Sequence, residues 1–220
     1  MEACYQEVTA AERALYGDAL ILLCGAISEF VSCMDMIRRY RISQGFRDPV
    51  ASVQTRIKSA ESMRGKLERQ QLPITADSAL HKVWDAAGVR LICPFVEDIF
   101  TTLELVQTIP GIQILQEKDY IHHPKPNGYR SYHVVLSIPL RFTRSQPGEP
   151  VWLELQMRTL AMDCWASIEH RLKYKREVLH QALIVDELKR CADEIASTDL
   201  SLETIRHLID ETSKQEATVL

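Results

Sequence analysis

The sequence lacks the features that mark disulfide-rich, repetitive or disordered proteins. Its 220 residues include only six cysteines, none in a CxxC pair, and no internal repeat or low-complexity segment. This density excludes a disulfide scaffold, so we interpret the cysteines as reduced and mostly buried thiols of a cytoplasmic protein. Hydrophobic residues make up 46% and charged residues 25% of the chain, which is typical of a soluble globular protein.

A membrane-spanning run and an excess of basic charge are also missing. The apolar run 19–27 is too short to cross a bilayer, and acidic residues precede it, unlike the basic start of a signal sequence. The formal net charge of −4 argues against a protein whose main task is coating nucleic acid, but it allows a local basic site. We therefore expect neither membrane insertion nor stable nucleic-acid binding.

The spacing of apolar residues predicts both helices and strands. Residues 9–40 should form one helix, or two with a break near Gly25. Five strands are expected at 53–58, 89–93, 112–115, 132–140 and 151–158, with helices at 59–70, capped by Ser59, and at 98–108. The sequence therefore predicts an α+β protein with a mixed five-stranded sheet packed by helices.

The C-terminal third is expected to be helical. A helix at 160–173 should bury Met162, Trp165, Ile168 and Leu172, and two further helices are expected at 178–196 and 200–211, with Asp199 capping the second. We divide the chain into an N-terminal helical extension (1–45), a catalytic domain (46–176) and C-terminal helices (177–220) whose apolar stripes belong to the core or to a subunit interface.

The most distinctive segment is 119–133, DYIHHPKPNGYRSYH, which is too polar for a core strand and too rich in proline for a helix. It combines cations that can bind phosphate with aromatic rings that can stack on a base, which predicts a nucleotide-binding loop. The alternative is a proline-stiffened connection in which Asn127 and Gly128 make a tight turn between two strands.

Two carboxylates stand out elsewhere. Asp85 comes just before a strand that contains Arg90, and both would be costly in a pure packing role because buried charges need partners. Glu154 lies on a later strand, on the same face as Gln156. Carboxylates from two separate strands can hold Mg²⁺ together with phosphate oxygens. Alternatively, one acid is a helix cap and the other an exposed strand residue.

The segment KPNGYRSYH at 125–133 resembles the guanine-binding loop of the RelA/SpoT-type (p)ppGpp synthetases. Further segments similar to this family occur in order: TRIK at 55–58, DAAGVRLI at 85–92, ELQMRT at 154–159 and WASIEHRLKYK at 165–175. The resemblance implies a nucleotidyltransferase-like synthetase domain that transfers pyrophosphate from ATP to the 3′-hydroxyl of GDP or GTP and releases AMP, in the stringent response. The chain looks like a small, synthetase-only member, and such members are commonly homotetramers built through terminal helices.

The resemblance also implies roles for single residues. On the donor side, Arg56 and Arg90 would sandwich adenine, and Lys58 and Lys66 would hold the ATP phosphates. On the acceptor side, Lys125 and His133 would meet phosphates and Tyr129 would stack on guanine, with Asn127 and Gln156 as weaker candidates nearby. Asp85 and Glu154 would hold Mg²⁺, and Glu154 would also deprotonate the 3′-hydroxyl.

Two other functions fit the same residues. Toxin-like relatives pyrophosphorylate adenine nucleotides or the 3′ end of tRNA, and tyrosine stacking is tolerant of base identity. A catalytically silent nucleotide sensor would also need the cations and the aromatic loop, although it has little need of both acids.

Overall fold

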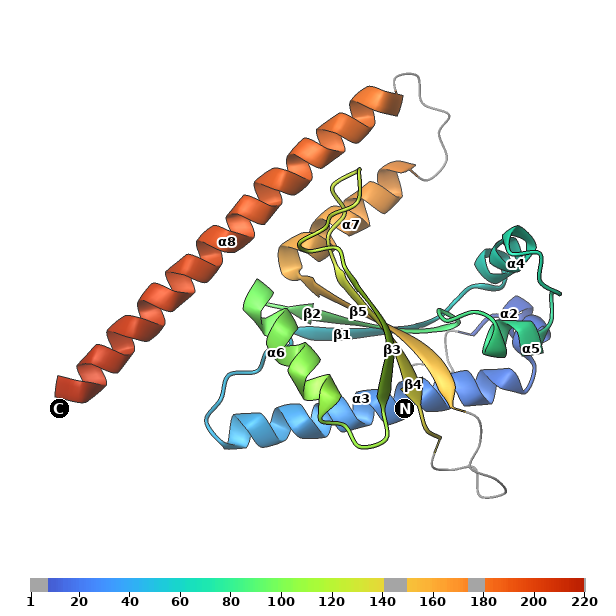
Figure 1. Ribbon diagram of the computed structural model, residues 1–220, viewed down its shortest axis with the longest axis horizontal. Helices are drawn as coiled ribbons and strands as arrows, with labels where there is room; N and C mark the ends of the chain where they lie inside the picture. Colours follow the sequence, from blue (N-terminus) through green and yellow to red (C-terminus); the bar gives the residue numbers. More distant parts are fainter. Residues whose placement is uncertain (1–7, 141–149, 174–180, 220) are drawn as a thin grey trace.

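The computed structural model describes residues 8–140, 150–173 and 181–219, which form a five-stranded sheet surrounded by helices (Figure 1). The strands are β1 (Ser52–Ile57), β2 (Ala87–Cys93), β3 (Gln113–Asp119), β4 (Tyr132–Ile138) and β5 (Val151–Thr159). Their order across the sheet is β1-β2-β5-β4-β3, with β2 parallel to β5 and the other neighbours antiparallel. The predicted mixed five-stranded fold is confirmed.

One face of the sheet carries the main hydrophobic core. The paired residues Val89, Leu155 and Val134 are buried there against α3 (Ala19–Ser43) and α6 (Val96–Gln107). Figure 1 shows α3 running beneath the strands. This helix is long and apolar enough to cross a membrane, but Leu23 and Phe30 are among the side chains that it buries in this core. The domain boundaries remain a prediction, and α3 shares one core with the sheet.

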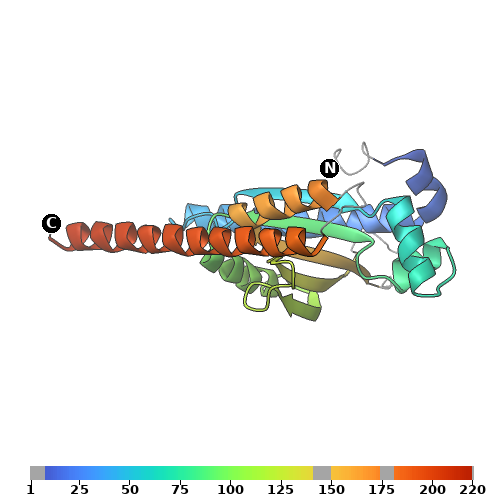
Figure 2. The same ribbon diagram turned by 90° about the horizontal axis from the view of Figure 1, so that it is seen from above.

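The other side of the sheet is covered in part by α7 (Leu160–Lys173) and α8 (Gln181–Val219), which pack against each other (Figure 1). A smaller hydrophobic cluster joins them, made by Trp165, Ala166, Leu188 and Ala192. Figure 2 shows the far end of α8 extending well beyond the sheet. This side carries polar residues on the central strands and an apolar cluster where the two helices meet.

The N-terminal helices break at a different place from the one predicted. Helix α2 (Ala10–Tyr16) ends at Gly17, whose φ of 50° is a left-handed value that favours glycine, and Gly25 lies inside α3. Thr9 and Glu12 form a capping box at the start of α2. The prediction of a break near Gly25 was wrong, because a glycine inside a well-buried helix is tolerated.

The C-terminal region also differs from the prediction, because α8 is a single helix rather than two. Asp199 does not cap a helix; it lies within α8, is 5% exposed, and accepts a hydrogen bond of 2.6 Å from the hydroxyl of Thr159. In α7, Met162 and Trp165 are buried as predicted, but Ile168 and Leu172 are 51% and 56% exposed. Neither helix buries its whole apolar face within this chain.

The predicted helix cap at Ser59 is confirmed, whereas the predicted burial of the cysteines is confirmed only in part. Helix α4 (Ala60–Arg69) is capped by Ser59, which accepts from the backbone of Ser62, as predicted, and a short α5 (Ala76–His81) follows it. The thiols are less buried than expected, because Cys24 and Cys93 are buried, whereas Cys164 is exposed.

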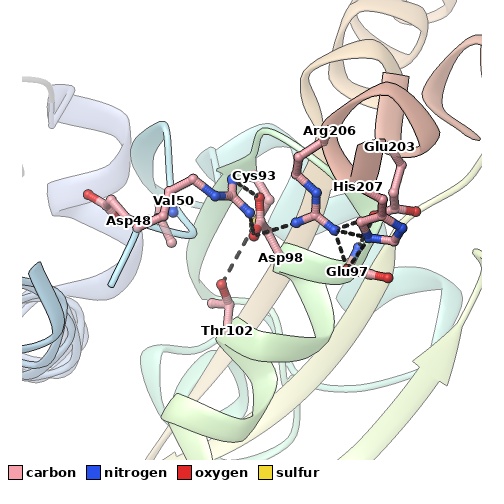
Figure 3. Close-up of polar contacts among 10 residues, drawn as sticks. Asp48, Val50, Cys93, Glu97, Asp98, Thr102, Glu203, Arg206 and His207 are labelled. Carbon is pink, nitrogen blue, oxygen red and sulfur yellow. Dashed lines mark hydrogen bonds and ion pairs between the residues drawn. The ribbon is translucent and has the colours of Figure 1, made fainter. Parts of the chain in front are cut away.

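A polar network holds α8 onto α6 and onto the segment before β1 (Figure 3). Asp98 of α6 is 4% exposed and accepts two hydrogen bonds, of 2.7 and 2.8 Å, from Arg47. Arg206 and His207 of α8 pair with Glu97, whose own backbone N–H donates to Glu203 at 2.8 Å. The position of α8 along the domain is therefore fixed by charge as well as by packing.

Candidate active site

Two rows of paired strand residues bring most of the predicted site residues onto the polar face of the sheet. The first row contains Arg56, Gly88 and Glu154, and the next contains Gln54, Arg90, Gln156 and His133. Directly paired residues on neighbouring strands point to the same face, so these side chains share one surface. The sheet register, rather than any single loop, assembles this part of the site.

Gly88 makes room for the first row. A Cβ atom on Gly88 would lie 3.2 Å from the side chain of Arg56, tighter than ordinary contacts. The arginine can therefore lie across β2 and reach Glu154, where its Nη2 is 3.4 Å from the carboxylate. A larger residue at 88 would push the guanidinium away from the centre of the sheet.

Glu154 is the central carboxylate of this face, with its side chain 19% exposed. Burial alone would raise its pKa, but His133, Arg56 and the 2.9 Å hydrogen bond from Gln156 outweigh burial and lower the pKa of Glu154 to about 2. Glu154 is therefore ionised at neutral pH and able to accept hydrogen bonds or bind a cation.

His133 lies between Glu154 and the acceptor loop. Its Nδ1 is 3.5 Å from the Glu154 carboxylate, and its Nε2 is 2.8 Å from the hydroxyl of Tyr129. Burial lowers the pKa of His133, the charge of Glu154 opposes this, and the cations Arg158 and Lys125 add to the lowering. The imidazole is consequently neutral at neutral pH.

Asp85 lies just before β2 and is enclosed by two lysines. Lys58 Nζ and Lys66 Nζ, from the end of β1 and from α4, each lie 2.9 Å from its carboxylate oxygens. Burial would raise the pKa of Asp85, but these two ammonium groups outweigh burial and lower it. The predicted phosphate-binding lysines are thus held together by one carboxylate.

Asp85 and Glu154 are chemically suited to Mg²⁺, because both are ionised oxygen donors. The Oδ1 atom of Asp85 is buried and faces Lys66 Nζ at 2.9 Å. Trp84, next to Asp85 in the sequence, and Trp152, two residues before Glu154 on β5, meet edge to face with their ring centres 5.9 Å apart. The described residues contain no cluster of three or more His, Cys, Asp or Glu, so a cation here would also need ligand oxygens from a substrate.

The predicted nucleotide-binding loop joins β3 to β4 at residues 120–131 and contains the tight turn. Gly128 N–H donates to the carbonyl of Lys125 at 2.8 Å, and Gly128 has φ of 88°. The turn prediction is therefore confirmed, and it is compatible with a binding loop because it presents Lys125 and Tyr129 together.

The exposed side chain of Lys125 lies over two aromatic rings, with its Nζ 4.8 Å from the ring centres of both Tyr120 and Tyr129. Asn127, a weaker candidate for the acceptor side, makes two hydrogen bonds within the protein. Its amide donates to Glu169 of α7 at 2.9 Å, and its oxygen accepts from the backbone of Tyr129. Asn127 thus shapes the loop in this conformation rather than facing open space.

A cavity of about 460 Å³ lies between the polar face and α7. Both candidate adenine-binding arginines, Arg56 and Arg90, line it together with Tyr129 and Arg158. The cavity continues the surface that carries Gln156, so donor-side and acceptor-side residues border one hollow. A flat, charged ligand would meet planar guanidinium groups and an aromatic ring there.

Sequence reasoning assigned no role to Tyr120, Arg158, Asp163 or Glu169. Arg158 is two residues beyond Gln156 on β5, so the same period of two could have placed it on this face. Asp163 and Glu169 reach the site from α7, and the strand pattern gives no signal for them. They depend on how a helix packs over the sheet.

Comparison with known proteins identifies relatives over most of the chain. Residues 55–178 match the family described as the region found in RelA / SpoT proteins. The chain is 36% identical to the GTP pyrophosphokinase YwaC of Bacillus subtilis (strain 168) over 173 residues, which are 79% of this chain and 81% of YwaC. It is 31% identical to the GTP pyrophosphokinase YjbM of the same organism, over 84% of this chain and 86% of YjbM.

Solved structures agree with these relatives. The crystal structure of small alarmone synthetase 1 from Bacillus subtilis bound to its product pppGpp has a TM-score of 0.76 and 31% identity, covering 87% of this chain and 96% of that one. Small alarmone synthetase 2 from the same organism has a TM-score of 0.75 and 33% identity, covering 86% of this chain and 98% of that one. The similarity therefore includes the fold and the segments that build the polar face.

Proposed function

Because the chain belongs to the RelA/SpoT family, we propose that it is a small alarmone synthetase, a GTP pyrophosphokinase of the stringent response. The enzyme transfers pyrophosphate from ATP to the 3′-hydroxyl of GDP or GTP and gives ppGpp or pppGpp. In this reaction the 3′-oxygen forms a bond to the β-phosphorus of ATP, the bond between that phosphorus and the oxygen bridging to the α-phosphate breaks, and AMP leaves.

One observation carries the proposal: cations and an aromatic ring surround Glu154 on a single face of the sheet. Arg56 approaches Glu154 from the β1 side and His133 from the β4 side. Two substrates bound on these two sides would meet at the central carboxylate. Such an arrangement suits a reaction between two nucleotides, since binding them side by side lowers the entropic barrier to reaction.

The donor side binds ATP through the planar guanidinium groups of two arginines and the ammonium groups of two lysines. The guanidinium groups of Arg56 and Arg90 border the cavity and are suited to stack on adenine. Lys58 and Lys66 hold the donor phosphates and neutralise the charge that develops as the pyrophosphate is transferred. In the free protein Asp85 keeps both ammonium groups in place.

The acceptor side binds GDP or GTP through the loop at 120–131. Tyr129 stacks on guanine, and Lys125, which is exposed next to that ring, binds the acceptor phosphates with His133. Gln156 lies between the two sides and donates to Glu154. Asn127 contributes through the turn that presents Tyr129.

Asp85 and Glu154 would hold Mg²⁺ together with substrate phosphate oxygens. When bound, this ion neutralises phosphate charge and makes the 3′-hydroxyl easier to deprotonate. A carboxylate with a pKa of about 2 is a weak base by itself, so Glu154 orients the hydroxyl through a hydrogen bond and accepts its proton only as the new bond forms.

The test is incubation with labelled ATP, Mg²⁺ and one acceptor at a time, namely GDP, GTP, ATP or tRNA, followed by identification of the products. We expect AMP and a 3′-pyrophosphorylated guanosine nucleotide. Label appearing in an adenine nucleotide or in tRNA would establish the toxin-like alternative. Tight nucleotide binding without AMP formation would establish a silent sensor.

The protein is proposed to work as a soluble homotetramer in the cytoplasm. Among the described side chains of α8, six large apolar ones are exposed in the single chain: Leu183, Leu200, Leu202, Ile205, Leu208 and Ile209. Exposed apolar surface of this extent is typical of a subunit interface. Light scattering at several protein concentrations tests this assembly, and a monomer at all concentrations would contradict it.

A further inference from the structure

Arg158 is a buried cation that the proposed reaction leaves without a role. It is 5% exposed and lies on the polar face of β5. Its guanidinium donates to the hydroxyl of Tyr129 at 2.6 Å and lies over the Tyr129 ring, with its central carbon 5.1 Å from the ring centre. A buried charge of this kind is expensive unless partners compensate it.

The contacts of Arg158 give a hydrogen-bond chain a single direction. Arginine can only donate, so the Tyr129 oxygen accepts from Arg158. The ionised Glu154 can only accept from Nδ1 of His133, which leaves Nε2 of the neutral ring to accept from the Tyr129 hydroxyl. A neutral imidazole that accepts at Nε2 carries its proton on Nδ1, the atom that faces the Glu154 carboxylate at 3.5 Å. The hydrogen bonds therefore run in one direction, from the guanidinium of Arg158 to the carboxylate of Glu154, and each donor faces an acceptor.

Asp163 of α7 balances the cation at the start of this chain. Its Oδ1 lies 3.0 Å from Nη1 of Arg158 and 3.2 Å from Nη1 of Arg90. The two guanidinium groups repel each other: burial lowers the pKa of Arg90, the charge of Arg158 lowers it further, and Asp163 opposes both. One carboxylate thus allows two like charges to stay side by side over the cavity.

We propose that Asp163 is a positioning residue that serves both nucleotide sites at once. It holds Arg90 toward the donor base. Through Arg158 it also fixes the ring of Tyr129 for the acceptor base. This inference rests on the proposed function, because the two bases are those of ATP and of GDP or GTP.

The experiment measures nucleotide binding by titration calorimetry, separately for GDP and for a non-hydrolysable ATP analogue. Asp163→Asn keeps the size of the side chain and removes its charge, and charge-assisted hydrogen bonds are about twice as strong as neutral ones. We expect both dissociation constants to rise about tenfold. Unchanged affinities for both ligands would overturn the proposal, and so would a loss confined to one of them.

A second variant tests the link to Tyr129 without touching α7. Tyr129→Phe keeps an aromatic ring for stacking but removes the hydroxyl that Arg158 and His133 bind. We expect weaker binding of GDP with unchanged binding of the ATP analogue. Wild-type affinity for GDP in this variant would contradict the proposed link.

Asp35→Asn is the matched control, because Asp35 forms an exposed ion pair with Arg39 on α3, far from this face in sequence and in fold. It should leave both affinities unchanged.

Product formation by the wild-type protein distinguishes a failure of the proposed role of Asp163 from a failure of the proposed function. If wild type makes the product and Asp163→Asn binds both ligands normally, only the role of Asp163 fails; if wild type makes no product with any acceptor, the proposed function fails.

Discussion

The donor side and the acceptor side of the proposed site are built in different ways. Most donor-side residues lie on the strands or beside them: Arg56 and Arg90 are placed by the register of β1 and β2, and Lys66 comes from α4. The acceptor loop is shaped by helices that come much later in the chain. Glu169 of α7 binds Asn127, and Asp193 of α8 pairs with Arg130 at 2.9 Å.

Gly128 of the acceptor loop packs directly against α8. A Cβ atom on Gly128 would lie 2.5 Å from the Cβ of Ala192, so no other residue fits without movement. Helix α8 is therefore part of the support of the acceptor loop as well as a proposed interface helix. The donor side depends mainly on the sheet, with Lys66 from α4 and Asp163 from α7, whereas the acceptor side also requires correct packing of α8.

The largest effect is expected where the two sides meet. Glu154→Gln keeps the shape but removes the charge that Arg56, His133 and the proposed metal share, and kcat should fall by more than about a hundredfold. Steady-state AMP release measures this. Glu187→Gln, which breaks an exposed pair with Arg190, is the control and should retain normal kcat. Comparable turnover by the two variants would contradict the central role of Glu154.

The next effect separates the two sides. Gly128→Ala adds a methyl group at φ of 88° and against Ala192, so the loop must shift, and KM for GDP should rise about tenfold while KM for ATP stays unchanged. Gly45→Ala is the matched control, with φ of 84° but no atom within 4 Å of the added carbon. Both variants carry the same backbone strain, so a rise in KM for GDP in both would attribute the effect to strain rather than to α8.

The clash with α8 can also be relieved. Ala192→Gly removes the methyl group that the new side chain would strike, and the double variant should recover part of the affinity for GDP. Additive losses in the double variant would contradict direct support of the loop by α8.

A smaller effect is expected on the donor side. Arg56→Lys keeps the positive charge near Glu154 but loses the planar group that is suited to stack on adenine. KM for ATP should rise by roughly threefold to tenfold, with KM for GDP unchanged. A change in KM for GDP alone would reverse the assignment of the two sides.

The same contrast explains how much the sequence could predict. Strand periodicity predicted that Glu154 and Gln156 share one face of their strand and that Arg56 lies on the polar face of another, because a period of two needs only local information. The sheet register then brings these residues and Arg90 together. The sequence could not show that Asp163 or Ala192 contacts the site, since helix packing over a sheet depends on the whole fold. The long α8 was predicted as two helices for a related reason. Aspartate is a common helix N-cap residue, but the carboxylate of Asp199 accepts a hydrogen bond from Thr159 of β5 instead.

The smallest expected effect is on the melting temperature, and it tests how α8 is held in place. Two acids of this helix, Asp199 and Asp193, have pKa values shifted in opposite directions. Burial raises the pKa of Asp199; the hydrogen bond from Thr159 opposes this and the charge of Glu203 adds to it. A raised pKa means that the folded state holds the proton more tightly, so the stability associated with Asp199 is lost as pH rises through that pKa. Asp199→Asn should therefore raise the melting temperature by roughly 2 °C at pH 7 and by less at pH 4.

Asp193 on the same helix should show the reverse. Lys189 and Arg130 lower its pKa, so its contribution to stability is present at neutral pH and is lost as pH falls. Asp193→Asn should thus lower the melting temperature at pH 7 and also at pH 4, because a carboxylate whose pKa is lowered below its ordinary value is still largely ionised at pH 4. Melting curves of both variants at the two pH values check this. Since Arg130 belongs to the acceptor loop, only Asp193→Asn should also weaken GDP binding, and an equal change in ATP binding would show that α8 supports both sides alike.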